Sequence, residues 1–560
     1  MSTSRKMAQA EVPAWQEQAL RFRTVRDASM STINTQLPDL SGDKQLARVI
    51  GVPRLHLTQA EVHLTESAPE VLVRSLAVGR VTAKEVVLAF LRRAAIAQKL
   101  ANCVYELLPD RAVERAQELD DYLAQNGKPS GPLHGLPISV KEHISVAGRD
   151  NTAGFVGWIG NTSRDDASII KILLDAGAVI YARTTEPQGL MAIETGSNIT
   201  GVTVNPHNRA LTCGGSSGGE AALLALRGSP LGIGSDIGGS IRLPAAHCGL
   251  YGFKPSSGRL PLMGVEAFCT GSDTIAPSIG PLSPTLEGIK LFMDTVLMSK
   301  PWQNDPFIHP LPWQSRADHL RQRGKVTLVV GVMWTDDVVQ PAPPIKRALL
   351  EVVDKLKSTP GVEVIDWKPF QQTDALEILK RLYHPDGGKA FFENLALSGE
   401  PILPLPAWAV RDEPGIEPLS IKGVWEWTKK RDQFRHSYFQ AWKTIAPDMD
   451  VILCPACPMP APVHNTSRYW GYTSLWNLLD YPAITFPVTR IDPEKDGQDL
   501  DYVPKNDSDR WCYDNYDVHE RKYAPVSLQL VARRLEDEKL LQAAEKIQQE
   551  IGLPFVDCLA

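Results

Sequence analysis

The chain has 560 residues, of which 43% are hydrophobic and 22% charged, a balance typical of a globular protein with a full core. The formal net charge is −6 and lysine and arginine form no basic block, which disfavours a nucleic-acid partner. Eight cysteines are too few for a disulfide scaffold, and no window approaches the roughly 18 consecutive apolar residues of a membrane span, so we expect a cytoplasmic protein without a membrane partner.

The beginning of the chain is predicted to be a polar, irregular extension over residues 1–55, followed by one large domain over 56–555. Two Ser/Thr-x-x-Glu patterns, at Ser67–Glu70 and Thr82–Glu85, stand directly before apolar periodic runs. Such a pattern satisfies the free backbone N–H groups at the start of a helix. We therefore expect a capped helix to begin at each pattern, and a third helix near residues 110–125.

Strand and helix signals then alternate. Residues 136–141 (LPISVK) are typical of a short buried strand that ends at Lys141, residues 165–177 of a helix stopped by Gly177, and residues 178–184 of a second apolar strand. Two strands joined through a helix pair in parallel. We therefore predict an α/β protein built on a mostly parallel, twisted sheet.

Two glycine-flanked serines occupy the middle of the chain: Ser216 in CGGSSGGE and Ser240 in DIGGSIR, on either side of the apolar helical run EAALLALRG. The first segment fits the G-x-S-x-G pattern of a nucleophile elbow, in which Ser216 would attack with the help of an Asp and a His. Both segments also fit plain turns and helix caps. That interpretation does not explain why two such segments flank a single helix. The glycines at 232–238 miss the dinucleotide fingerprint by one residue, which disfavours nucleotide binding.

Three other candidate residues have ordinary explanations. Cys454 and Cys457 form a C-x-x-C pair, but in the absence of a second pair a strand and a rigid loop are favoured over a zinc or redox site. His247 follows Ser240 closely and invites a Ser-His pair, but a packed histidine with satisfied hydrogen bonds is favoured. We expect no metal and no cofactor.

The block at residues 214–261, GGSSGGEAALLALRGSPLGIGSDIGGSIRLPAAHCGLYGFKPSSGRLP, resembles the signature block of the amidase signature family. The upstream segment 131–142 (GPLHGLPISVKE) resembles the lysine segment of that family. The likeness runs from about residue 60 to 550, includes NLLDYPAITFPV at 477–488, and is closest to fungal acetamidases and general amidases. It implies a mixed sheet in a single large domain with helices on both faces.

The resemblance also implies a catalytic triad, with Ser240 as the acyl nucleophile, Ser216 as the bridging serine and Lys141 as the base. A serine hydroxyl needs an adjacent base, and lysine can act as one only when it is neutral, which burial favours. Ser216 can then return a proton to the departing amine. The resemblance further implies that the peptide bond between Gly215 and Ser216 is cis.

The glycines beside Ser240 gain a purpose in this chemistry. Backbone N–H groups can converge on an oxyanion only where side chains stay away, and the N–H groups of Ile237, Gly238, Gly239 and Ser240 stand in a row. We expect them to bind the substrate oxygen. By the resemblance, Leu190 lines the acyl pocket.

Polar residues beside the serines are predicted to hold these loops. Ser217, Asp236 and Arg242 are the candidates for hydrogen bonds within them, with surface pairing of Arg242 as the alternative. Ser235 stands where relatives commonly have threonine, and a hydroxyl is kept. The resemblance places the catalytic core at about 131–261 and divergent substrate-pocket inserts at about 300–470.

The first functional hypothesis is an amide hydrolase that converts a small-molecule amide to a carboxylate and ammonia or an amine through an acyl-enzyme. A homodimer remains open. A second hypothesis is a transamidation subunit of a tRNA-dependent amidotransferase, which needs a stable partner complex. A third is a non-catalytic family member that serves as an interaction module, and the complete Lys-Ser-Ser set counts against it. Which amide is cleaved does not follow from the fold.

Overall fold

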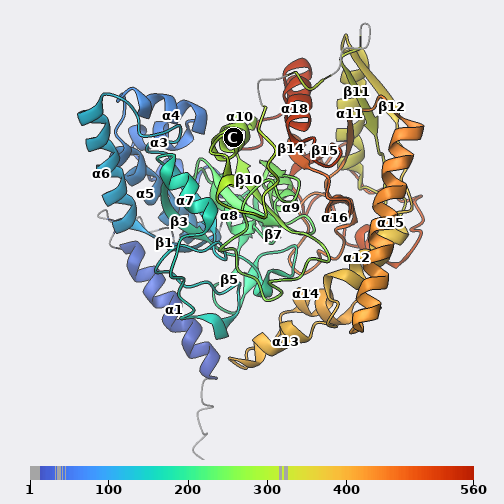
Figure 1. The fold of residues 1–560 in the computed structure, drawn as a ribbon, viewed down its shortest axis with the longest axis horizontal. Helices are drawn as coiled ribbons and strands as arrows, with labels where there is room; N and C mark the ends of the chain where they lie inside the picture. Colours follow the sequence, from blue (N-terminus) through green and yellow to red (C-terminus); the bar gives the residue numbers. More distant parts are fainter. Residues whose placement is uncertain are drawn as a thin grey trace, which may run out of the picture.

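An eleven-stranded sheet crosses the whole molecule in the computed structural model, from β1 at one edge to β12 at the other (Figure 1). The structure describes residues 13–31, 33, 40, 42–43, 46–314, 318–320 and 326–560. The strands, in their order across the sheet, are β1 (Val104–Leu107), β3 (Val179–Thr184), β2 (Pro137–Lys141), β8 (Gly232–Asp236), β10 (Ser278–Ser283), β9 (Tyr251–Lys254), β14 (Ala483–Arg490), β15 (Pro525–Val531), β13 (Val451–Pro455), β11 (Leu328–Val332) and β12 (Val362–Asp366).

The sheet is mixed, as expected, but the expectation that it is mostly parallel is wrong. Among the described strands, six of the ten neighbouring pairs are antiparallel. The predicted strand-helix-strand unit is confirmed as β2, α7 (Ser168–Asp175) and β3, with β2 and β3 parallel. Most of the other neighbouring strands in the sheet are not connected to each other through a crossover helix. Antiparallel pairing does not need such a connection.

The helices that precede and follow β1 form a cluster at one end of the sheet. They are α3 (Gln59–Glu66), α4 (Pro69–Ala77), α5 (Ala83–Ala101) and α6 (Pro109–Asn126), which is the predicted third helix. The capping box of Thr82 and Glu85 is confirmed at the start of α5. The one expected at Ser67 is wrong.

Proline explains that error. Pro69 occupies the first turn of α4, where its missing N–H costs nothing, so Ala68 becomes the N-cap residue. Ser67 instead ends α3 and donates its hydroxyl to the carbonyl of His63 at 2.7 Å. The capping box that α3 does have, from Thr58 and Glu61, went unpredicted.

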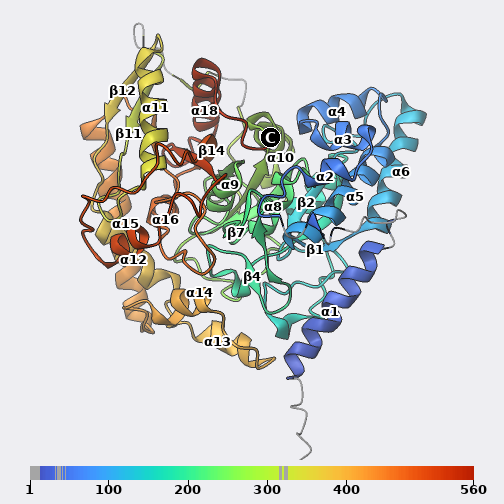
Figure 2. The same cartoon turned by 180° about the vertical axis from the view of Figure 1, so that it is seen from behind.

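Residues 14–31 of the expected irregular extension form the helix α1 (Ala14–Ser31), which lies beside β1 (Figure 2). The expectation fails there because Phe22 packs against Tyr105 of β1, with ring centroids 4.4 Å apart, and Arg23 donates to the carbonyl of Ile199 at 2.8 Å. Tertiary contacts therefore order a helix whose own sequence is only weakly amphipathic. Residues 1–12 lie outside the described residues.

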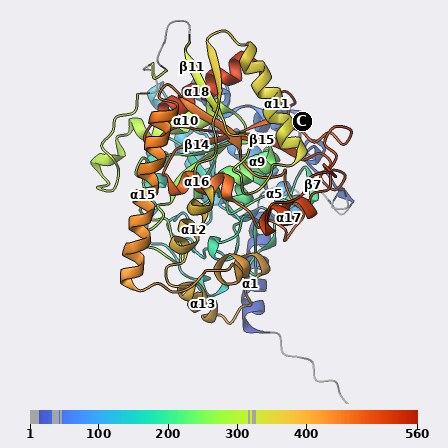
Figure 3. The same ribbon diagram turned by 90° about the vertical axis from the view of Figure 1, so that its right-hand side faces the viewer.

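Helices cover both faces of the sheet, as the side view shows for α11 and α15 (Figure 3). Two short helices, α8 (Gly218–Ala225) and α9 (Arg242–Cys248), pack against the central strands. The others are α2 (Val52–Leu55), α10 (Leu286–Met298), α11 (Pro343–Ser358), α12 (Gln372–Tyr383), α13 (Lys389–Ala396), α14 (Pro404–Ala407), α15 (Ile421–Ile445), α16 (Gly471–Leu478), α17 (Asp507–Asp514) and α18 (Asp537–Ile551). Within the described ranges, every helix is too short or too polar to cross a membrane.

Candidate active site

The parallel neighbours β2 and β8 end side by side, and their last residues carry polar side chains. Lys141 ends β2, while Ser235 and Asp236 end β8. The carboxyl ends of parallel strands in an open α/β sheet are where ligands bind. Ser216 and Ser240 each stand two residues before a helix, α8 and α9 respectively, and both line a cavity that Ser235 and Asp236 also line.

Lys141 is fully buried, and its ammonium or amine nitrogen has two hydroxyl partners. The Nζ atom lies 2.5 Å from the Oγ of Ser216 and 3.0 Å from the Oγ of Ser235. Ser216 therefore has a lysine beside it, in place of the histidine that a nucleophile elbow requires. The elbow interpretation of Ser216 has no support in these contacts.

Burial lowers the pKa of Lys141 to about 8, although the nearby carboxyl of Glu186 opposes the shift. Burial also raises the pKa of Glu186 well above its usual range, and the adjacent carboxyl of Glu142 adds to that effect. A protonated Glu186 attracts the ammonium less than a carboxylate would. With a pKa of about 8, roughly a tenth of Lys141 is a neutral amine at pH 7, and this fraction rises with pH.

The two serine loops are connected to each other. The backbone N–H of Ser217 donates to the carbonyl of Ser240 at 3.0 Å, and the peptide bond between Gly215 and Ser216 is cis, as expected. The Ser217 hydroxyl accepts the backbone N–H of Ser235 and donates to the carbonyl of Ser235, both at 3.3 Å. Ser216 and Ser240 line the same cavity.

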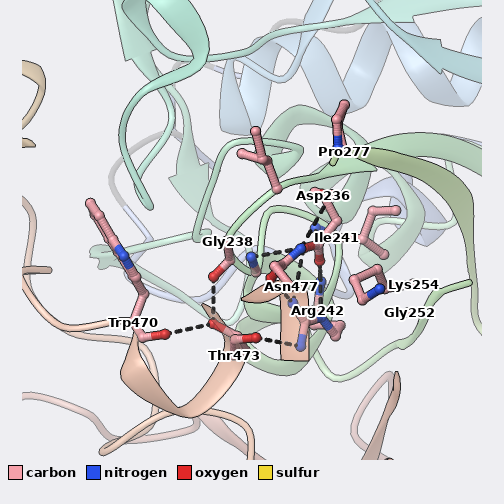
Figure 4. A network of polar contacts seen from close by, with 12 residues as sticks. Asp236, Gly238, Ile241, Arg242, Gly252, Lys254, Pro277, Trp470, Thr473 and Asn477 are labelled. Carbon is pink, nitrogen blue, oxygen red and sulfur yellow. Dashed lines mark hydrogen bonds and ion pairs between the residues drawn. The ribbon is translucent and has the colours of Figure 1, made fainter. Parts of the chain in front are cut away.

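A buried ion pair fixes the loop that carries Ser240 (Figure 4). Two nitrogens of the Arg242 guanidinium bind the two carboxylate oxygens of Asp236 at 2.9 and 3.0 Å, and both side chains are fully buried. Arg242 also donates to Asn477 of α16 at 2.7 Å and to the carbonyl of Thr473 at 2.9 Å. The predicted role of Asp236 and Arg242 in holding the loop is confirmed, and surface pairing of Arg242 is excluded.

The Asp236 carboxylate is ionised near neutral pH. Burial alone would raise the pKa of Asp236, but the Arg242 guanidinium outweighs burial and holds it far below its usual range. The carboxylate also accepts the backbone N–H groups of Gly239 at 2.8 Å and of Ile241 at 3.1 Å. The Asp236 carboxylate therefore holds the turn around Ser240 through the backbone and through the Arg242 side chain.

These contacts revise the expected row of oxyanion donors. Because the N–H of Gly239 donates to Asp236, it is not free to bind a substrate oxygen. The carbonyls of Ile237 and Gly238 accept hydrogen bonds from Tyr383 at 2.8 Å and Thr473 at 2.7 Å. In the part of the chain that the structure describes, the N–H groups of Ile237, Gly238 and Ser240 have no internal acceptor. Gly239 keeps a backbone role, because its φ of +132° suits only glycine.

The cavity beside the serines has a volume of about 280 Å³ and walls that are mainly apolar. Its lining includes Leu190, Met191, Leu262, Phe268, Leu382 and Tyr383, so Leu190 shares a cavity with Ser216 and Ser240. The described lining residues include no lysine and no arginine. Their only carboxylate, that of Asp236, is neutralised by Arg242. The cavity thus suits an uncharged apolar group.

His143 also lines this cavity, and sequence reasoning missed it. It follows the Lys-Glu pair at the end of β2, and no local pattern marks it as functional. Tyr383, Thr473 and Asn477 were missed as well, although Asn477 opens a segment that resembles the family. Their partners lie more than a hundred residues away along the chain, which no local spacing reveals.

The residues that we set aside lie elsewhere. His247 is packed on α9 and buried, but it is not satisfied as expected, since neither ring nitrogen has a hydrogen-bond partner in the described chain. Cys454 is on β13, and both it and Cys457 are buried free thiols. Within the described ranges, no three His, Cys, Asp or Glu side chains gather as metal ligands would.

Removing the charge of Asp236 tests the importance of the ion pair. Asp236→Asn leaves the Arg242 guanidinium buried without a counter-charge, so we expect the free energy of unfolding, measured in urea, to fall by about 3–5 kcal/mol. Glu393→Gln is the matched control, because Glu393 pairs with Lys389 on the surface, where both side chains are more than half exposed. That control is expected to change stability by less than about 1 kcal/mol. Equal losses in the two variants would contradict the assignment.

The chain is similar to known proteins over most of its length. The model of the family described as Amidase matches residues 85–541. The acetamidase of Aspergillus oryzae is 37% identical over 89% of this chain and 92% of its own, and the acetamidase of Emericella nidulans is 37% identical over 89% and 91%. Among solved structures, a fatty acid amide hydrolase superposes with a TM-score of 0.89 at 33% identity, covering 97% of this chain and 96% of that one.

Proposed function

The chain belongs to the Amidase family and is an amide hydrolase, and on this premise we propose that Ser240, Ser216 and Lys141 cleave uncharged carboxamides through an acyl-enzyme. One observation carries the proposal: a fully buried lysine lies 2.5 Å from Ser216, at a cavity that Ser240 also lines. A lysine in water is charged at neutral pH and cannot act as a base. Burial of Lys141 removes that obstacle.

In the acylation step, neutral Lys141 takes the proton of Ser216, and Ser216 takes the proton of Ser240. The Oγ of Ser240 attacks the amide carbon, and the carbonyl oxygen becomes an oxyanion. The C–N bond then breaks, and Ser216 delivers a proton to the leaving nitrogen while Lys141 returns one to Ser216. The leaving amine requires this proton because it is a strong base.

Water then attacks the ester formed with Ser240, activated by the same relay, and releases the carboxylate. During both steps the oxyanion needs fixed donors, and the free N–H groups of Ile237, Gly238 and Ser240 are the candidates. Tyr383 and Thr473 hold the carbonyls of this segment, which orients its N–H groups before substrate arrives. A preorganised donor set requires no rearrangement during the reaction.

The cavity suggests which acyl groups fit. The acetamidases are named for a two-carbon amide, and fatty acid amide hydrolase for the amides of fatty acids. The cavity has a volume of about 280 Å³, which is several times the ~30 Å³ that one water molecule occupies in the liquid. It therefore has room for more than an acetyl group. Its apolar walls favour an aliphatic or aromatic acyl group of intermediate size.

Turnover of a series of aliphatic amides tests this function and its specificity. We expect kcat/KM for ammonia release to rise from acetamide to hexanamide by up to about fourfold for each methylene, because burial of a CH₂ contributes ~0.8 kcal/mol. The monoamide of adipic acid is the matched control substrate, since it has hexanamide's chain length but ends in a carboxylate. We expect it to react poorly because the apolar wall offers that charge no partner. A maximum at acetamide would contradict the size assignment, and absence of turnover with every amide would contradict the function.

A further inference from the structure

One buried histidine at the cavity has no part in the relay described above. His143 is 3% exposed, and both of its ring nitrogens have partners. Its Nδ1 atom lies 2.7 Å from the backbone carbonyl of Glu266, and its Nε2 atom lies 2.8 Å from the Oγ of Ser235. Ser235 is also the second partner of Lys141.

The contacts of His143 fix which nitrogen carries the proton. A carbonyl oxygen only accepts hydrogen bonds, so Nδ1 must donate to Glu266. Burial lowers the pKa of His143 to about 3, and the charge of Lys141 acts in the same direction, so the imidazole is neutral and Nε2 has no proton. Nε2 must therefore accept the hydroxyl proton of Ser235.

This assignment fixes the direction of the next bond. With its only proton directed to His143, Ser235 can offer Lys141 nothing but a lone pair, so Lys141 must donate an N–H to Ser235. A neutral amine has two N–H groups and one lone pair. Once one N–H points to Ser235, the lone pair can face the Ser216 hydroxyl, which is the orientation that proton transfer requires.

We propose that His143 is a positioning residue that acts through Ser235 to aim the lone pair of Lys141 at Ser216. The inference rests on the proposed function, because it assumes that Lys141 is the base. Without His143, the Ser235 hydroxyl could rotate and donate its proton to the lysine lone pair. That bond would compete with Ser216 and would stabilise the neutral amine.

The direction of the expected pH effect follows from this competition. Of these two residues, Lys141 is the one that titrates between pH 5 and 10, since its pKa is about 8 and that of His143 is about 3. Loss of the acceptor at Ser235 destabilises the ammonium relative to the amine, so the midpoint of the rate increase moves to lower pH. The other charged groups around this pair are Glu142, Arg183, Glu186, Glu220 and Asp236. Burial raises the pKa of Glu220 to about 8 and that of Glu186 well above its usual range, but both side chains are present in the wild type and in every variant, so a difference in midpoint between them is assigned to Lys141.

The test measures how fast a fluorophosphonate labels Ser240 as a function of pH, with the modified residue identified by peptide mass spectrometry. We expect His143→Phe, which keeps a ring but no nitrogen, to lower the labelling rate at high pH by about tenfold, the effect typical of a lost outer-shell partner. Its midpoint is expected below that of the wild type. Ser235→Ala should shift the midpoint in the same direction, and the double variant should lose no more than the worse single variant. Ser235→Thr, which keeps the hydroxyl, should retain the wild-type midpoint.

Several results would overturn the proposal. A wild-type midpoint in both His143→Phe and Ser235→Ala, or losses that multiply in the double variant, would reduce His143 to a packing residue. If His143→Phe fails to fold, Ser235→Ala and Ser235→Thr decide the question by themselves.

The control is His436→Phe, which replaces an exposed histidine on α15 and should label as the wild type does. Absence of Ser240 labelling in the wild type would overturn the proposed function together with this inference, whereas labelled variants with unshifted midpoints overturn the inference alone.

Discussion

Ser240→Ala is expected to lower kcat/KM for amides by at least about 10⁴-fold, because the proposed proton relay activates the Ser240 hydroxyl and the acyl-enzyme forms on it. Ser240 is 7% exposed and lines the cavity, so its hydroxyl is within reach of a substrate. Residual turnover would come from the oxyanion donors and from binding alone. Ammonia release from hexanamide at saturating and at limiting concentrations measures the effect. The unfolding midpoint in urea should change little.

Two further serine variants make the assignment specific. Ser216→Ala removes the proton relay but leaves the nucleophile, so we expect a small residual activity and slow fluorophosphonate labelling at Ser240. Ser358→Ala is the matched control, since that hydroxyl is exposed on α11 and donates only to the carbonyl of Lys355. It should retain full activity. Labelling of Ser216 in the wild type, or normal rates after Ser240→Ala, would contradict the assignment.

The local parts of the site were predictable from the sequence, because short segments determine them. Glycines beside Ser216 and Ser240 mark loops at helix starts, and an apolar strand that ends in Lys141 marks a buried lysine. The structure places all three residues at the carboxyl ends of the neighbouring strands β2 and β8. Such signals depend on residues a few positions apart, which is where sequence patterns are informative.

The direction of individual hydrogen bonds could not be predicted. The oxyanion row looked equivalent at Ile237, Gly238 and Gly239, yet the Asp236 carboxylate takes the N–H of Gly239. The orientation of that carboxylate is fixed by Arg242 and by Asn477, and Asn477 lies in the C-terminal third of the chain, far from the row itself. The same reason hid His143, whose function depends on a carbonyl and a hydroxyl about a hundred residues away.

The sheet illustrates the same limit at larger scale. Parallel pairing of β2 and β3 follows from a helix that connects them, and it was predicted correctly. The antiparallel contact of β9 with β14 joins strands from distant parts of the chain. Strand signals indicate that a segment is extended and buried, but not which neighbour it pairs with.

Lys141→Ala is expected to reduce kcat/KM for amides by at least about 10³-fold, within the range that general-base catalysis contributes. In the wild type, the base is the deprotonated form of Lys141, so the rate should rise with pH, reach half of its maximum near the pKa of about 8, and level off above it. Below that pH the lysine is charged and holds no lone pair. The variant should lose the rise as well as the rate. A pH profile of kcat/KM from pH 5 to 10 measures both effects.

The chain offers a matched control in Lys254, a second buried lysine whose pKa burial also lowers to about 8. Its Nζ donates to the backbone carbonyl of Pro255 at 3.0 Å, and it does not line the cavity. Lys254→Met should therefore keep the rise near pH 8, even if the variant is less stable, because the titrating base is still present. If the rise disappears in Lys254→Met and persists in Lys141→Ala, the base has been assigned to the wrong lysine. If both variants keep it, the titrating group is neither of these lysines, and the assignment of Lys141 as the base fails.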